Sequence, residues 1–144
     1  LEGQILSHQN DQSGARSAFA EAMELAPNSP DVNYRYADYL LNQNEVDQAL
    51  EAAQKAVAAQ RTHPYYTEVS ARIAYRQEDY EAAEEWIDIA RNQGAKYWPQ
   101  ALELSGDIQF QLKNIEQAVT YWEQARALGE NSQRLLDKIA NRSL

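Results

Sequence analysis

Carboxylates are the side chains in this chain that most resemble a chemical site. Glu81, Glu84, Glu85 and Asp88 would share one face of a helix, so their oxygens could converge on a cation. Glu84 and Glu85 could also act as a general acid and base. However, the spacing lacks the loop glycine and alternating ligands of a calcium loop, and no nucleophile or pocket is indicated nearby. The favoured interpretation is a solvated outer helix face, with no metal site.

Other reactive side chains are sparse. The chain has no cysteine and two histidines, His8 and His63. Each histidine stands beside an expected helix end, where an exposed or capping role is the usual one. No GxSxG motif and no phosphate-binding glycine loop occur. We therefore expect no catalytic residues, no cofactor and no enzymatic activity.

The charge balance restricts the possible partners. The chain has 13 Lys and Arg against 22 Asp and Glu, a net charge of −9. Such a surface repels nucleic-acid phosphates and anionic membranes. No apolar run approaches the roughly 18 residues that a membrane span needs. Trp86, Trp98 and Trp122 are interpreted as helix-packing residues rather than a platform for bases, so we expect neither nucleic acid nor membrane insertion.

Small residues and prolines recur with one period. In the stretch 114–129, two alanines seven residues apart flank Trp122. The same pair recurs at steps of 34, 34 and 35 residues, as Ala15/Ala22, Ala49/Ala56, Ala83/Ala90 and Ala118/Ala125. Pro30, Pro64 and Pro99 follow the same steps. Two independent marks with a period near 34 indicate a two-helix repeat.

Helix signals divide the chain in the same way. Ser29, Pro30 and Asp31 form a helix start, and Gly94 suits the position just after a helix end. The extra residue of the longer repeat is expected in 93–98. In the closing helix, Leu135, Leu136 and Ile139 share one side and should cover the last repeat. The expected helices are Gln12–Ala26, Pro30–Asn42, Val46–Gln60, Pro64–Arg76, Tyr80–Gln93, Pro99–Leu112, Ile115–Leu128 and Ser132–Arg142.

These marks resemble the tetratricopeptide repeat (TPR). Its small first-helix residue falls on Gly3, Ala37, Ala71 and Gly106. The large residue early in the second helix falls on Val46, Tyr80 and Ile115. The chain departs from the pattern where Arg61 and Ala95 replace the late proline. It departs again where Asn33, Thr67 and Leu102 replace an aromatic residue of the first helix.

The resemblance implies an all-α fold, a right-handed α-solenoid of antiparallel helix pairs with a C-terminal capping helix. Residues 1–144 would form a single array. Its parts would be a partial first repeat (1–29), repeats at 30–63, 64–98 and 99–130, and the capping helix (131–144). The small residues let helix axes approach closely, and a larger side chain there would cost about 1–3 kcal/mol.

The resemblance also implies a concave groove lined by the first helices, where a protein or peptide segment binds. The alternative is that the mapped positions are ordinary exposed residues. The mapped groove residues are Tyr34, Asp38, Leu41, Tyr65, Glu68, Arg72, Tyr75, Arg76, Glu103, Asp107 and Phe110. The carboxylate clamp of some family members would require Lys, Asn or Arg where Tyr34, Asp38, Gln100 and Leu104 stand, so such a clamp is not expected.

Arg72 and Arg76 are the distinctive pair in this set. They lie four residues apart on one helix face, where they could attract an acidic segment. The alternative is that they only neutralise Glu68, Asp38 or Asp107, as exposed ion pairs worth about 0–1 kcal/mol.

A different class of function remains open. The chain starts at Leu1 within an expected helix, so it is interpreted as a piece of a longer protein. The apolar edge with Leu1, Ile5 and Leu6 could pack against the parent chain or form a homodimer. The main prediction is a non-catalytic protein-interaction module. Its last repeat and end helix look like those of bacterial TPR proteins, from the cytoplasm or the cell envelope.

Overall fold

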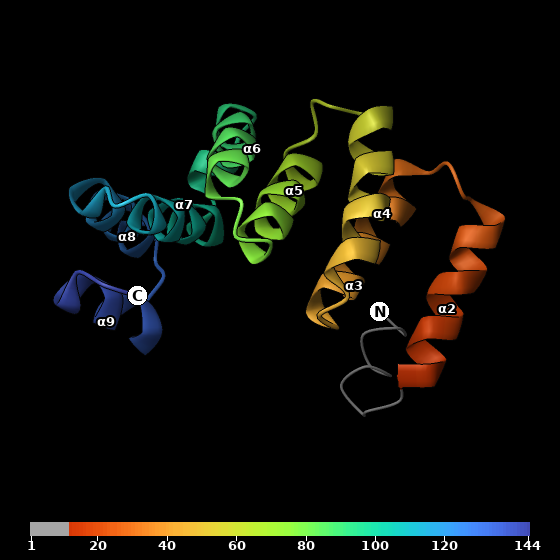
Figure 1. Ribbon diagram of the computed structural model, residues 1–144, viewed down its shortest axis with the longest axis horizontal. Coiled ribbons are helices and arrows are strands. Elements are labelled where there is room, and N and C mark those ends of the chain that lie inside the picture. Colours follow the sequence, from red (N-terminus) through yellow and green to blue (C-terminus); the bar gives the residue numbers. More distant parts are fainter. Residues whose placement is uncertain (1–11) are drawn as a thin grey trace. The chain divides into compact units, whose positions relative to one another are not determined.

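The computed structural model describes residues 12–144, without the side chain of Gln12. The expected first helix with Gly3 and His8, and the apolar edge with Leu1, Ile5 and Leu6, lie outside the described residues. Within residues 12–144 the structure has eight α-helices, one short 3-10 helix and no strand (Figure 1). This confirms the all-α repeat fold, and each expected helix is found with ends that agree to within one residue.

The described residues divide into two compact units, 12–60 and 61–144. The first contains α2 (Gln12–Leu25), α3 (Pro30–Asn42) and α4 (Val46–Ala59). Its core is rich in small residues, and Ala15, Ala37 and Ala49 are fully buried. The Phe19 ring of α2 stacks on Tyr39 of α3 at 4.6 Å between centroids, which fixes α2 against the α3–α4 pair.

The second unit contains α5 (Pro64–Arg76), α6 (Tyr80–Asn92), the 3-10 helix η1 (Ala95–Tyr97), α7 (Pro99–Gln111), α8 (Ile115–Ala127) and α9 (Gln133–Asn141). α6 packs against both α5 and α7, and α8 packs against both α7 and α9 (Figure 1). η1 was not predicted. It occupies the connection where the longer repeat was expected to carry its extra residue.

Caps set where the first helices begin. The Ser29 hydroxyl accepts from Val32 N at 3.2 Å, His63 Nδ1 from Tyr65 N at 3.2 Å, and the Ser132 hydroxyl from Leu135 N at 3.3 Å. Such caps satisfy backbone N–H groups that have no partner within the helix. Trp98 is the N-cap residue of α7. The four N-cap residues are 34, 35 and 34 positions apart, at Ser29, His63, Trp98 and Ser132. α9 therefore stands in register with the first helices, and its Leu135 is fully buried.

The turn inside each repeat uses a left-handed residue. Asn44, Glu78 and Lys113 have φ of 64°, 62° and 71°. They follow α3, α5 and α7 at steps of 34 and 35 residues, so the turn is a repeated element. None is glycine, although this backbone conformation favours glycine.

Gly106 allows α7 and α8 to approach closely. A Cβ atom there would lie 2.3 Å from Nε1 of Trp122 and 2.9 Å from the backbone oxygen of Ala118. The Trp122 side chain is fully buried against this position. The expected role of the small first-helix residue is therefore confirmed at Gly106.

Two polar residues, Asn33 and Thr67, stand where the family pattern has an aromatic residue of the first helix. Both take part in hydrogen bonds that hold the connection before that helix. Asn33 Nδ2 donates to the backbone oxygens of Pro27 and Ser29, both at 3.0 Å. In the next repeat Gln93 Nε2 donates to the Arg61 oxygen at 2.9 Å, and the Gln93 side-chain oxygen accepts from Thr67 Oγ1 at 2.8 Å. Both arrangements hydrogen-bond the backbone oxygen of the residue at which the family pattern has a late proline, Pro27 in one repeat and Arg61 in the next.

Candidate functional site

The predicted groove residues of α5 are partly engaged with one another. Arg72 Nε lies 3.0 Å from Glu68 Oε2, across one helix turn. The side chain of Glu68 is 6% exposed and that of Arg72 is 29% exposed. The Tyr75 hydroxyl accepts a long hydrogen bond of 3.4 Å from Gln111 Nε2 of α7. Burial raises the pKa of Tyr75, so its hydroxyl stays neutral at ordinary pH. Tyr65 and Arg76 are exposed.

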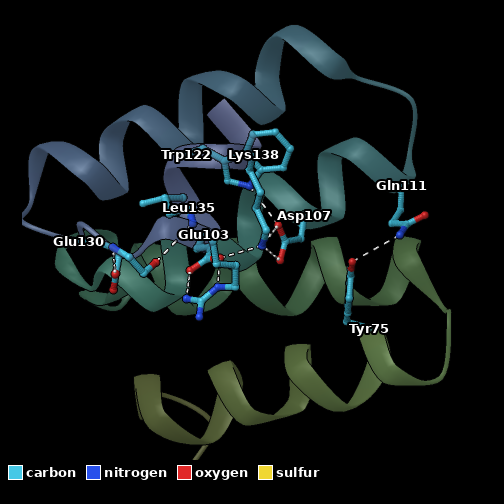
Figure 2. A network of polar contacts seen from close by, with 10 residues as sticks. Tyr75, Glu103, Asp107, Gln111, Trp122, Glu130, Leu135 and Lys138 are labelled. Atoms are coloured by element: carbon cyan, nitrogen blue, oxygen red, sulfur yellow. Dashed lines mark hydrogen bonds and ion pairs between the residues drawn. The ribbon is translucent and has the colours of Figure 1, made fainter. Parts of the chain in front are cut away.

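The predicted residues of α7 bind the side chains of α9 (Figure 2). Glu103 accepts two hydrogen bonds from Arg134, from Nε at 2.8 Å and from Nη2 at 2.7 Å. Lys138 Nζ lies between the two acids, 2.7 Å from Glu103 Oε2 and 2.9 and 3.1 Å from the Asp107 oxygens. Because Lys138 is only 11% exposed, these contacts stand largely out of water.

Trp122 adds α8 to this network. Its indole Nε1 donates to Asp107 Oδ1 at 3.0 Å. Phe110 is partly buried and lies tilted against the same indole, with 6.2 Å between centroids. Asp107 thus links the packing of α7 against α8 to the docking of α9.

The two acids titrate differently because their surroundings differ. The hydrogen bond from Arg134 holds the pKa of Glu103 down at about 2, and Lys138 contributes in the same direction. Burial raises the pKa of Asp107, and Lys138 and Trp122 offset only part of that effect. The Lys138 pKa is raised by its two carboxylate partners despite burial, so the ammonium stays charged.

Successive first helices are therefore joined through their predicted groove positions. Tyr75 with Gln111 connects α5 to α7, and Glu103 with Arg134 connects α7 to α9. We call these side chains of α5, α7 and α9 together the first-helix strip of the second unit. Its members are Glu68, Arg72, Tyr75, Glu103, Asp107, Gln111, Arg134 and Lys138.

Arg134 and Lys138 were missed as site residues. Their signal was available, because they lie four apart on α9 and match two acids four apart on α7. The first unit carries the other predicted residues on α3, where Tyr34 and Asp38 are partly exposed and Leu41 is buried.

The acidic side chains of α6 are not gathered into a cation site. Glu84 Oε2 accepts from Gln109 Nε2 at 2.5 Å, Asp88 pairs with Arg91, and Glu81 and Glu85 are exposed. Within residues 12–144, no cluster of three or more His, Asp or Glu side chains could hold a metal ion. None of the described helices is long and apolar enough to cross a membrane.

Comparisons with known proteins agree with the repeat architecture. Residues 6–73 match the family model described as tetratricopeptide repeat. The fold is similar to the crystal structure of MamA, with a TM-score of 0.81 and 15% identity over 97% of this chain and 81% of that chain. It is similar to pilF of Pseudomonas aeruginosa, with a TM-score of 0.83 and 22% identity over 97% of this chain and 64% of that chain.

A third similar structure contains a peptide. It is the first TPR of Spaghetti (RPAP3) bound to the HSP90 peptide SRMEEVD, with a TM-score of 0.73 and 18% identity over 78% of this chain and 89% of that chain. A comparison with curated protein sequences finds no match. At these identities the structural similarities establish the fold.

Proposed function

Because this chain belongs to the tetratricopeptide repeat family, we propose that it binds a segment of another protein along its first helices and catalyses no reaction on it. The first TPR of RPAP3 holds a peptide. Our proposal extends that kind of activity, and not that particular ligand, to this chain.

The observation that carries the proposal is that side-chain contacts join each first helix of the second unit to the next. Side-chain hydrogen bonds join α5 to α7, through Tyr75 and Gln111, and α7 to α9, through Glu103 and Arg134. A segment lying across these helices would meet hydroxyl, amide, guanidinium and carboxylate groups in a fixed order. Such a pattern supports specificity because a wrong partner leaves polar groups unpaired.

The charges of the strip favour a segment that brings carboxylates or backbone oxygens. Glu103 is already matched by Arg134 and Lys138, so its charge is largely satisfied within the protein. Arg134 stays 62% exposed and uses Nε and Nη2 for Glu103, which leaves Nη1 directed away from that pair. Together with Arg72 and the exposed Arg76, it offers donors to an acidic segment.

An array of blocked acidic, neutral and basic peptides, probed with the full chain, tests this proposal. For the peptides that bind, we expect Arg72→Ala/Arg76→Ala and Tyr75→Ala to weaken binding about tenfold or more, because central contacts dominate binding energy.

Two exposed residues of the second helices serve as controls, Arg126→Ala on α8 and Glu85→Ala on α6. Arg126→Ala removes the same kind of charge as the strip variants. If the controls weaken binding as much as the strip variants do, the proposed site is wrong.

A further inference from the structure

The connections before α5 and before α7 form an acid-free edge in a chain of net charge −9. Residues 61–67 and 89–102 contain no Asp or Glu, whereas the first turn of α3 carries Asp31 and the connection before α9 carries Glu130. The acid-free edge consists of Arg61, His63, Tyr65, Lys96, Tyr97 and Trp98. It lies in the second unit and shares no residue with the first-helix strip.

These two connections lie side by side. Gln93 Nε2 donates to the Arg61 oxygen at 2.9 Å and so joins the first connection to the second. The Tyr65 and Trp98 rings stack with 4.7 Å between centroids. His63 stacks on Tyr66 at 4.2 Å and lies 5.3 Å from Tyr65, which extends the row of rings. The rings of His63, Tyr65 and Trp98 are therefore held in place by contacts with one another and with Tyr66.

Two aromatic rings of the acid-free edge remain open to solvent. Tyr97 is 67% exposed and Tyr65 is 48% exposed, and both are among the exposed large hydrophobic side chains of the described residues. The Lys96 ammonium lies 5.2 Å from the centroid of the Tyr97 ring. Arg61 is exposed on the neighbouring connection. Exposed tyrosine, tryptophan and arginine side chains are enriched in protein-binding sites relative to ordinary surface.

We propose that the acid-free edge binds an acidic protein segment that carries aromatic or proline side chains. The carboxylates of the segment would pair with Lys96 and Arg61, and its rings would pack on Tyr97, Tyr65 and Trp98. Charge complementarity selects this occupant, because the edge is locally cationic and presents no carboxylate of its own. Proline-rich segments dock on exposed aromatic rings at low entropic cost.

The same charge argument disfavours polymers with dense negative charge. Nucleic acid and anionic membrane require many phosphate contacts, and the rest of this chain, at −9, repels them. A short peptide meets only the local field of the edge. This binding is additional to that proposed for the first-helix strip, and each can fail without the other.

The test uses a blocked, fluorescein-labelled peptide in which aspartate alternates with tyrosine and proline, titrated into the full chain and followed by anisotropy. We expect Lys96→Glu and Arg61→Glu each to weaken binding about tenfold, since each turns an attraction into a repulsion. Tyr97→Ser should weaken it about threefold to tenfold. Added salt should also weaken binding, because the Debye screening length falls from about 10 Å at 0.1 M to about 3 Å at 1 M ionic strength.

Matched variants distinguish the edge from general charge and hydrophobicity. Lys113→Glu changes another exposed lysine, and Leu128→Ser removes another exposed apolar side chain. Both should leave the affinity within about twofold of the parent. Equal losses for Lys113→Glu and Lys96→Glu would overturn the proposal, because only net charge would then matter.

Three further outcomes would also overturn it. The first is absence of binding, and the second is equal binding of a peptide with lysine in place of aspartate. The third is tighter binding to anionic vesicles or to a single-stranded oligonucleotide. If Arg72→Ala/Arg76→Ala abolishes binding while Lys96→Glu does not, the peptide occupies the first-helix strip, and the edge proposal fails while the proposed function stands.

Discussion

Replacing Gly106 by alanine should destabilise the second unit severely. The new Cβ would stand 2.3 Å from Nε1 and 2.4 Å from Cδ1 of Trp122, and 2.9 Å from the Ala118 oxygen. The first two distances are more than 1 Å short of ordinary contact. The indole has no room to move outward because Trp122 is fully buried. Whether α7 and α8 separate or the indole shifts, the hydrogen bond from the indole to Asp107 is broken.

The expected cost combines three effects. Overpacking costs about 1–3 kcal/mol. Loss of the hydrogen bond to a charged carboxylate costs about 1.5–3 kcal/mol. The better helix propensity of alanine returns about 1 kcal/mol. The net loss in the free energy of unfolding is therefore about 1.5–5 kcal/mol, measured by urea denaturation followed by circular dichroism.

A double-mutant cycle with Trp122→Leu isolates the contact. Without the indole, Gly106→Ala should lose most of its cost, because the nearest atoms to the new Cβ are gone. A Gly106→Ala protein that is as stable as the parent, or about 1 kcal/mol more stable as helix propensity alone would give, refutes the close approach described here.

The remaining predictions concern the polar network and the turns. The free energy of unfolding should fall as the pH drops from about 4.5, the ordinary pKa of a glutamate, to about 2, the pKa of Glu103 in the folded state. Protonation over this range removes the contribution of the ion pair. Acid titration of Glu103→Gln should show a smaller fall over the same range. Lys138→Met should lower the free energy of unfolding by about 3–5 kcal/mol, because two carboxylates lose a shared buried cation; a neutral effect in urea denaturation would contradict the network. Glu78→Gly should raise stability by up to about 1 kcal/mol, because glycine adopts the left-handed conformation at φ 62° without strain; Glu81→Gly, inside α6, should lower it by about 1 kcal/mol in the same assay.

The fold could be predicted largely from the sequence because small residues and helix-cap residues recur with the period of the repeat. Alanines such as Ala83 and Ala118 are fully buried, as expected where two helices pack closely. Prolines at 30, 64 and 99 begin α3, α5 and α7, so the period and the helix starts report the same boundaries. η1 escaped prediction because a three-residue 3-10 turn leaves no periodic signal. The repeat boundaries as domain limits stay a prediction.

The candidate site could be predicted only in part. The groove positions came from the family pattern, which identifies positions and not their partners. Glu103 and Asp107 meet Arg134 and Lys138 because of the way α9 docks on α7 and α8. These contacts join residues that are 31 or more positions apart in the sequence. The polar residues Asn33 and Thr67 were recognised as departures from the pattern. Their role in holding the preceding connection required the geometry.

The most direct measurement is the map of backbone amide shifts when an acidic peptide selected on the array is added to isotopically labelled full chain. The proposed function predicts that the shifts gather on first-helix positions around Arg72, Tyr75 and Gln111, and change little on the outer faces of α6 and α8 around Glu85 and Glu123. The acid-free edge predicts a second group at Lys96 and Tyr97. Shifts confined to the outer faces of α6 and α8 would contradict binding along the first helices.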